Sequence, residues 1–182
     1  NSISYYDNNQ TMYLKNNTKI INSSNQMFAD SMTIIFEDSL FSNIHSLGNV
    51  KIKSNVNGKL NKNGFLENFV DQMNGHSMVI DYTNGEIDSL HIYGMATSFF
   101  HVIEDTLLMG VNDVSGDSIR MKFNDSYLSN ITVNGGSRGI FNPEKANSNI
   151  DTTIIYKGEK IDYYLDTEET YLNKKASVSN LE

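Results

Sequence analysis

The chain of 182 residues has no cysteine and no tryptophan, and its single proline is Pro143. Without cysteine the chain forms no disulfide bonds and offers no thiolate ligand to a metal. Cysteine usage therefore does not indicate whether the protein resides in an oxidising or a reducing compartment. No apolar run approaches the ~20 residues that a membrane-spanning helix needs. These absences leave the fold to be inferred from the pattern of the remaining residues.

Basic residues are also scarce. The chain has 14 Lys and Arg against 22 Asp and Glu, which gives a formal net charge of −8. Nucleic acid is therefore excluded as an expected partner, because phosphate binding requires a basic surface. The chain begins at Asn1 and not at Met, so the sequence does not indicate whether the native protein has a signal peptide. Residues 181–182 resemble a cloning scar.

A short pattern occurs three times, in residues 29–36, 75–82 and 116–123. Each copy is followed at the same spacing by a turn residue, an aliphatic residue and a glycine: Asp38, Ile44 and Gly48; Asn84, Leu90 and Gly94; Asp125, Ile131 and Gly135. Shorter copies at both ends bring the prediction to five repeats, at about 1–25, 29–54, 75–100, 116–141 and 158–178. An insertion at 55–74 lengthens one of them, and all five are assigned to a single domain, residues 1–180.

Each copy has the alternation of a β-hairpin. Met32, Ile34 and Phe36 alternate with residues of the opposite face, and charged residues hold the alternate positions of the third copy. Asn84-Gly85 is a strong signal for a tight turn, and the recurring glycine is expected where a strand bends. No segment has convincing helical spacing. The sequence therefore predicts an all-β chain, either a sandwich or a folded, slot-like roll.

Catalytic and metal-binding sites are not expected. Ser77 follows His76, but neighbouring strand residues point to opposite faces and cannot form a nucleophile–base pair. The histidines show no spacing typical of metal ligands, and no cofactor is expected.

Three segments carry a resemblance to a known family: residues 2–7, 12–20 and 27–32. With residues 47–52, whose Leu-x-Gly-Asn-Val element is repeated loosely at 93–96, they resemble the OstA-like family, which includes LptA-type proteins and the periplasmic domain of LptD. The resemblance covers nearly the whole chain, although Asn16 and Lys174 replace the recurring glycine in the end copies. It implies an elongated, repeat-built β-jellyroll, an open, taco-like roll of two facing antiparallel sheets.

The resemblance also implies a function. Family members act in the periplasm, shield the acyl chains of lipopolysaccharide on the way to the outer membrane, and stack end to end. The chain is therefore expected to be a non-enzymatic binding protein for lipopolysaccharide or a related glycolipid, and to associate with itself or with other β-jellyroll transport proteins. The expected groove lining is Ile34, Phe36, Ile44, Met78, Ile80, Tyr82, Leu90, Ile92, Met121, Phe123, Ile131 and Val133.

Two other functions remain open. A structural β-solenoid-like segment of a surface or assembly protein would fill its interior with its own side chains, which uses the same apolar residues. A carbohydrate-active β-helix enzyme would need clustered carboxylates on a concave face, whereas the Asp residues of the repeats fall in predicted turns.

Overall fold

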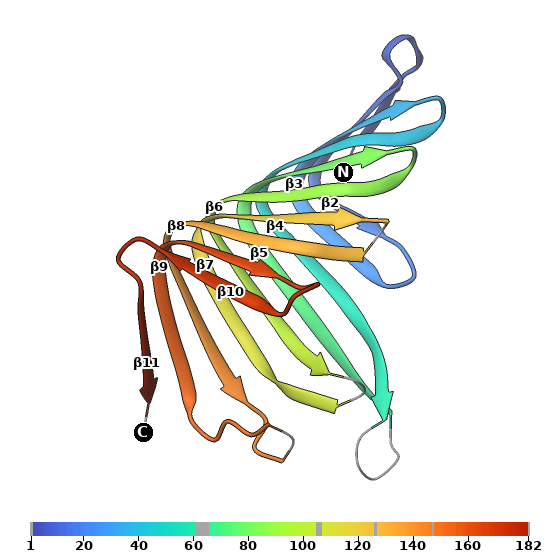
Figure 1. Ribbon diagram of the computed structural model, residues 1–182. Helices are drawn as coiled ribbons and strands as arrows, with labels where there is room; N and C mark the ends of the chain where they lie inside the picture. Colours follow the sequence, from blue (N-terminus) through green and yellow to red (C-terminus); the bar gives the residue numbers. More distant parts are fainter. Residues whose placement is uncertain (1, 61–65, 105–106, 126, 147, 182) are drawn as a thin grey trace.

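The computed structural model describes residues 2–60, 66–104, 107–125, 127–146 and 148–181 (Figure 1). Within these ranges the chain is all-β apart from one short 3-10 turn, η1 (Asp7–Asn9). The strands are β1 (Ser2–Tyr6), β2 (Thr11–Ile21), β3 (Asn25–Glu37), β4 (Leu40–Leu60), β5 (Leu66–Thr83), β6 (Glu86–Glu104), β7 (Leu107–Asn124), β8 (Tyr127–Pro143), β9 (Thr153–Tyr164), β10 (Glu169–Asn173) and β11 (Ser177–Leu181). The predicted all-β class is confirmed.

All strands belong to one antiparallel sheet. β1 to β10 pair in chain order, and β11 pairs with β9 beside β10. The sheet does not close on itself. Asn84 and Gly85 at the tip of the β5–β6 hairpin have φ of 54° and 81°, the left-handed conformation that their sequence predicts. Asp38 and Asp125 have the same sign of φ at the equivalent turns.

A line of β-bulges crosses the sheet at mid-strand. Between β4 and β5, for example, Leu47 pairs with Ser77 and Val50 with Gly75, so that two residues on β4 face one on β5. Each bulge contains a pair of residues with positive φ. In chain order these pairs are 16–17, 48–49, 94–95, 135–136 and 174–175. The single residues that face them are Asp30, His76, Asp117 and Glu159. We call this line the crease.

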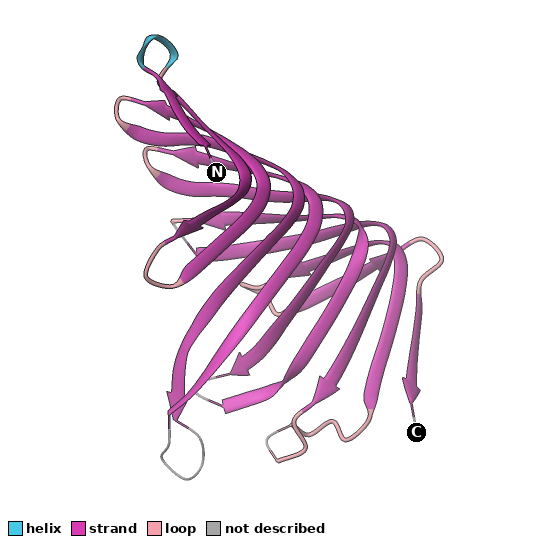
Figure 2. Ribbon diagram, turned by 180° about the vertical axis from the view of Figure 1, so that it is seen from behind, coloured by secondary structure: helices cyan, strands magenta, loops and turns pink. Residues whose placement is uncertain are grey.

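The crease bends the sheet into two walls (Figure 2). Wall A holds the strand halves toward the hairpin turns, residues 2–15, 31–47, 77–93, 118–125, 127–134 and 160–173. Wall B holds the other halves, residues 18–29, 50–60, 66–75, 96–104, 107–116, 137–143, 153–158 and 177–181. The expectation of two facing sheets is thus corrected, because the long strands cross the crease and the walls are two halves of one sheet.

Small residues on wall B lie directly beside the crease. Ala29 and Ala96 are buried there, and Gly75 and Gly116 take equivalent places. A β-carbon at Gly75 would overlap the Ile92 side chain of wall A, and one at Gly116 would crowd Val133. The absence of larger side chains lets the walls approach each other closely at the bend.

The predicted insertion at 55–74 extends the β4–β5 hairpin. Residues 55–60 continue β4, residues 66–74 belong to β5, and the positions between them lie outside the described residues. β5 pairs with β6 only as far as Gln72, opposite Phe99. Beyond that point Asp71 Oδ1 accepts a hydrogen bond from the backbone N–H of His101 at 3.0 Å and lies 2.7 Å from its ring Nδ1. The Asp71 side chain thus holds the two strands together where their backbone pairing ends.

Candidate functional site: the inner face of the folded sheet

The inner face of wall A carries three rows of side chains that run across the strands, parallel to the crease. Neighbours in the deep and middle rows are direct cross-strand partners, and in the outer row the two residues of each hairpin are, so the members of a pair face the same side of the sheet. The deep row, next to the crease, is Leu14, Met32, Ser46, Met78, Ile92, Ile119, Val133 and Ile161. The middle row is Met12, Ile34, Ile44, Ile80, Leu90, Met121, Ile131 and Tyr163. The outer row is Phe36, Phe41, Tyr82, Ile87, Phe123 and Leu128.

All twelve residues expected to line the groove belong to these rows. Eight of them are buried: Ile34, Ile44, Met78, Ile80, Leu90, Ile92, Ile131 and Val133. The other four, Phe36, Tyr82, Met121 and Phe123, are partly buried and pack against the buried cluster. All twelve side chains therefore belong to the inner face of wall A.

The sequence pattern does not predict the inward residues of the opposite wall, because the alternation changes phase at the crease. On β3, for example, the inward side chains are Met27 and Ala29 before the crease and Met32 and Ile34 after it, a step of three residues. Beyond Ala29, Val50 and Ala96, which lie next to the crease, the wall B side chains that face wall A are Ile20, Met27, Ile52, Met73, Ser98, Val114, Tyr156, Phe100, Asn112, Phe141 and Ile154. The apolar alternation of residues 96–102 and 154–158 is the signal that would have found part of this wall.

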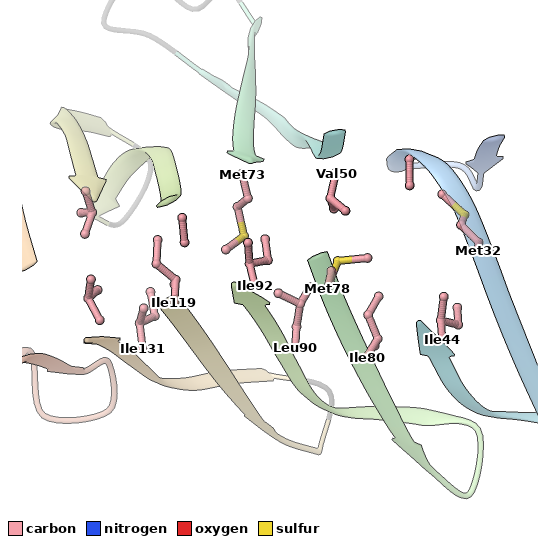
Figure 3. Close-up of a cluster of buried hydrophobic side chains, with 14 of the residues drawn as sticks. Met32, Ile44, Val50, Met73, Met78, Ile80, Leu90, Ile92, Ile119 and Ile131 are labelled. Carbon is pink, nitrogen blue, oxygen red and sulfur yellow. The ribbon is translucent and has the colours of Figure 1, made fainter. Parts of the chain in front are cut away.

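Side chains of the two walls point toward one another (Figure 3). Met73 of wall B extends toward Ile92 and Met78 of the deep row, which are both fully buried at 0% exposure. Exposure increases away from the crease, and Phe41 in the outer row is 42% exposed. The interior is therefore a wedge, closed by packing at the crease and accessible at the outer rows.

Aromatic rings follow the rim of wall A. Phe36 lies between Tyr5 and Phe41, with ring centroids 6.3 and 5.4 Å away, and Phe41 continues the series to Tyr82 at 5.6 Å. Burial raises the pKa of the Tyr82 hydroxyl. This rim presents a continuous apolar surface to anything that enters between the walls.

A polar group joins the walls at the C-terminal side. Tyr156 of wall B donates a hydrogen bond to Asn112 Oδ1 at 2.6 Å, and its hydroxyl lies 2.8 Å from that of Tyr163 on wall A. The two rings meet edge to face at 6.3 Å. Burial raises the pKa of both tyrosines, most strongly that of Tyr163. We call Tyr156, Tyr163 and Asn112 the tyrosine bridge.

The convex face of wall A carries a network of polar side chains. Asp81 accepts hydrogen bonds from Asn43 Nδ2 at 2.6 Å and from Ser89 Oγ at 3.0 Å. Nearby, burial and the positive charge of Arg120 lower the pKa of His91, and the charge of Asp81 partly opposes them. These groups form a cross-strand network on the side of wall A that faces away from wall B.

The residues considered for catalysis do not come together. His76 is exposed at the crease, and Ser77 pairs in wall A with Tyr93. The described ranges contain no cluster of His, Asp or Glu arranged to hold a metal ion. They also contain no helix with the length and hydrophobicity that a membrane span requires.

Two surface hollows lie at the ends of the sheet. One, of about 400 Å³, is lined by Ser4, Tyr6 and Tyr13 on β1 and β2. The other, of about 760 Å³, lies at the crease between Gly135, Glu159 and Lys174. Neither hollow is lined by any of the twelve residues expected to bind lipid.

No protein-family model matches the chain, and no curated protein sequence matches it either. The resemblance to the OstA-like family therefore rests on the short sequence motifs described above.

Proposed function

We propose that this protein is a non-enzymatic, periplasmic lipid-binding protein of the OstA-like type, a β-jellyroll built from five repeats. It holds acyl chains of a lipopolysaccharide-like glycolipid between its two walls during transport to the outer membrane. The observation that carries the proposal is the inner face itself: apolar rows run the length of the sheet, and their exposure increases toward an open side.

Burial of hydrocarbon supplies the driving force. Each methylene removed from water contributes ~0.8 kcal/mol, so a chain of about twelve carbons gains on the order of 10 kcal/mol before ordering costs. The deep row offers no room, because Met78, Ile92 and Val133 are fully covered by the protein's own side chains. The acyl chain therefore lies against the outer row, with Phe36 and Phe123 among its contacts, and no catalytic group takes part.

Photocrosslinking tests this placement. A benzophenone amino acid at Tyr82, in the outer row, is expected to label lipopolysaccharide added to the purified protein. The matched control places the same group at Tyr93, which is on β6 but on the convex side and 40% exposed. Labelling at Tyr82 without labelling at Tyr93 supports the proposal. Equal labelling at both positions, or none at either, contradicts it.

A charge in the outer row provides an independent test. Tyr82→Glu is expected to abolish glycolipid binding, because a carboxylate among the acyl methylenes loses its hydration. Tyr82 is partly exposed, so the fold tolerates the change better than it tolerates Ile80→Asp at a buried position of the middle row. Unchanged binding by a folded Tyr82→Glu variant would argue against lipid in this part of the wedge.

One alternative function has its own support. The burial of eight of the twelve residues, together with hollows that lie elsewhere, fits a structural sheet whose interior is filled by its own side chains. In that case neither the Tyr82 probe nor the Tyr93 probe labels lipid, and Tyr82→Glu affects only stability.

A further inference from the structure

The face of wall B that points away from wall A carries a row of side chains in which every charged residue is a cation. Its members alternate along their strands with inward residues such as Met27 and Ile52, and each is the cross-strand partner of the next. They therefore share the outer face of the sheet, directly beside the crease. We call them the basic row: Lys19, Phe28, Lys51, Asn74, Thr97, Ser115, Arg138 and Lys157.

No carboxylate neutralises the cations of the basic row within the described part of the chain. The ion pairs found there involve the carboxylates of Asp71, Glu159 and Asp162, and none of them includes a residue of this row. Lys19 instead lies 5.0 Å from the centre of the Phe28 ring. The positive charge of the row is therefore available to an anion outside the molecule.

The next row away from the crease, on the same face, adds one cation and two exposed apolar side chains. Its charged members are Lys53 and Asp113, and it also holds Ile21 and Phe99, which are 60% and 37% exposed. The two rows thus combine five cations with one carboxylate, in a chain whose net charge is −8. Cations beside exposed apolar side chains are typical of surfaces that bind the headgroup region of a membrane.

We propose that these two rows form a docking face for a membrane surface that carries anionic headgroups. Seven interstrand steps of ~4.8 Å separate Lys19 from Lys157, so the basic row is about 34 Å long. Neither of the two surface hollows described above is lined by a residue of these rows. A long row outside those hollows suits an extended anionic surface better than a single small anion. The docking is separate from the proposed binding of acyl chains, which takes place on the other side of wall B.

The carboxylates elsewhere in the chain do not cancel this attraction. Glu37, at a hairpin turn of wall A, lies seven residues beyond Asp30 at the crease, about 23 Å away at ~3.3 Å per residue. This is more than twice the Debye length of ~10 Å at 0.1 M salt. Of the crease carboxylates, Glu159 is paired with Lys175 at 2.9 Å, which leaves Asp30 and Asp117 against the five cations.

Flotation with lipid vesicles tests the inference. The wild-type protein is expected to bind vesicles of equal parts phosphatidylglycerol and phosphatidylcholine, to bind them less as salt increases, and not to bind phosphatidylcholine alone. The double variant Lys51→Gln, Lys53→Gln is expected to have a partition coefficient about 25-fold lower. Each cation near an anionic surface contributes ~1 kcal/mol, or about fivefold. Absence of wild-type binding to the anionic vesicles at low salt would overturn the inference.

The double variant Arg120→Gln, Lys122→Gln is the matched control. These two cations are also one position apart, on β7, but they lie on the convex side of wall A. Their removal changes the net charge equally and should leave vesicle binding at the wild-type level. An equal loss in both double variants would show that net charge alone matters, and would overturn the inference. Equal wild-type binding to anionic and neutral vesicles would also overturn it, but would leave acyl-chain binding between the walls intact.

A tryptophan probe locates the contact. The chain has no tryptophan, so Phe99→Trp places a single indole on the docking face, and Tyr93→Trp places one on the convex side of wall A as the control. Anionic vesicles are expected to shift the emission of the Phe99→Trp variant to shorter wavelength and to leave that of the Tyr93→Trp variant unchanged. An unshifted Phe99→Trp variant, with dimers in sedimentation velocity that Lys51→Gln, Lys53→Gln abolishes, would show that the face binds a second copy. That result would overturn membrane docking.

Discussion

The carboxylate of Asp30 occupies the place that a β-carbon of Gly48 would need, and Asn49 Nδ2 donates a hydrogen bond to it at 2.9 Å. The relationship recurs along the crease: Asp117 covers Gly135 in the same way, and His76 lies over Gly94. Each of these glycines has φ between 76° and 79°. The bend therefore depends on glycine for two separate reasons, the left-handed backbone and the side chain packed against it.

Two adjacent glycines allow the effect of the left-handed backbone to be measured separately from the effect of side-chain overlap. Gly135 and Gly136 both have positive φ, but a β-carbon would meet Asp117 at Gly135 and open space at Gly136. Gly136→Ala is expected to cost about 1 kcal/mol of unfolding free energy, from the left-handed backbone alone. Gly135→Ala is expected to cost more, roughly 2–3 kcal/mol, because the Asp117 side chain must also move. Urea unfolding of the two variants measures the difference.

The excess cost at Gly135 should depend on Asp117. In the Gly135→Ala, Asp117→Ala double variant the shorter side chain removes the overlap, so the two changes should be less destabilising than the sum of the single ones. Strict additivity would show that backbone strain explains the whole effect.

Depth in the wedge separates structural from accessible residues. Met78→Ala is expected to lower the unfolding free energy by about 2–5 kcal/mol, since Met78 is fully buried and its removal leaves a cavity. Phe41→Ala, at the exposed rim, is expected to cost less than about 1 kcal/mol. Chemical denaturation gives both values, and a similar cost at both positions would contradict the wedge.

The parts of the fold that the sequence predicted are those that local chemistry decides. The Asn84-Gly85 turn requires a positive φ at both residues, and Met32, Ile34 and Phe36 recur at every second position, so their strands and their inward face could be predicted. The bend at Gly48 was predicted for the same reason. Even the substituted positions Asn16 and Lys174, with φ of 68° and 53°, take the conformation of the glycines that they replace.

The parts that were missed depend on pairs distant in sequence. At each crease position one residue, such as Glu159, is inserted between the inward positions of the two walls and shifts the alternation. Inward residues of wall B such as Met73 and Tyr156 therefore could not be derived by extending the pattern of wall A. The tyrosine bridge joins Asn112 to Tyr156 across 44 positions, through the space left by Gly139. No local pattern in the sequence indicates such a contact.

The Asp71–His101 contact is expected to control the β4–β5 hairpin extension. Asp71→Ala removes the acceptor for the His101 backbone N–H and should increase amide exchange of residues 66–71 and of His101. Exchange of the buried residues Met78 and Ile80, in the same strand but beyond the crease, should stay slow. Equal acceleration at both ends of β5 would mean that the contact stabilises the whole sheet.

Alkaline pH should weaken the fold through the tyrosine bridge. The pKa of Tyr163 and that of Tyr156 are raised in the folded state, chiefly because burial excludes the phenolates from water. Below pH 10 both tyrosines are protonated in folded and unfolded chains alike. Above pH 10 the unfolded chain loses these protons more readily than the folded chain, so the unfolding free energy falls by at most about 1.4 kcal/mol per pH unit for each tyrosine. Urea unfolding between pH 9 and pH 11.5 measures this slope.

Tyr163→Phe identifies the source of that slope. The variant lacks one ionisable hydroxyl but keeps the ring and the Tyr156–Asn112 hydrogen bond, so its stability above pH 10 should fall about half as steeply from this source. Tyr127→Phe, at a residue that is 80% exposed on β8, serves as the control and should leave the wild-type slope unchanged. If Tyr163→Phe and wild type lose stability equally fast above pH 10, the Tyr163 hydroxyl is not held protonated between the walls, and the closed bridge described here is wrong.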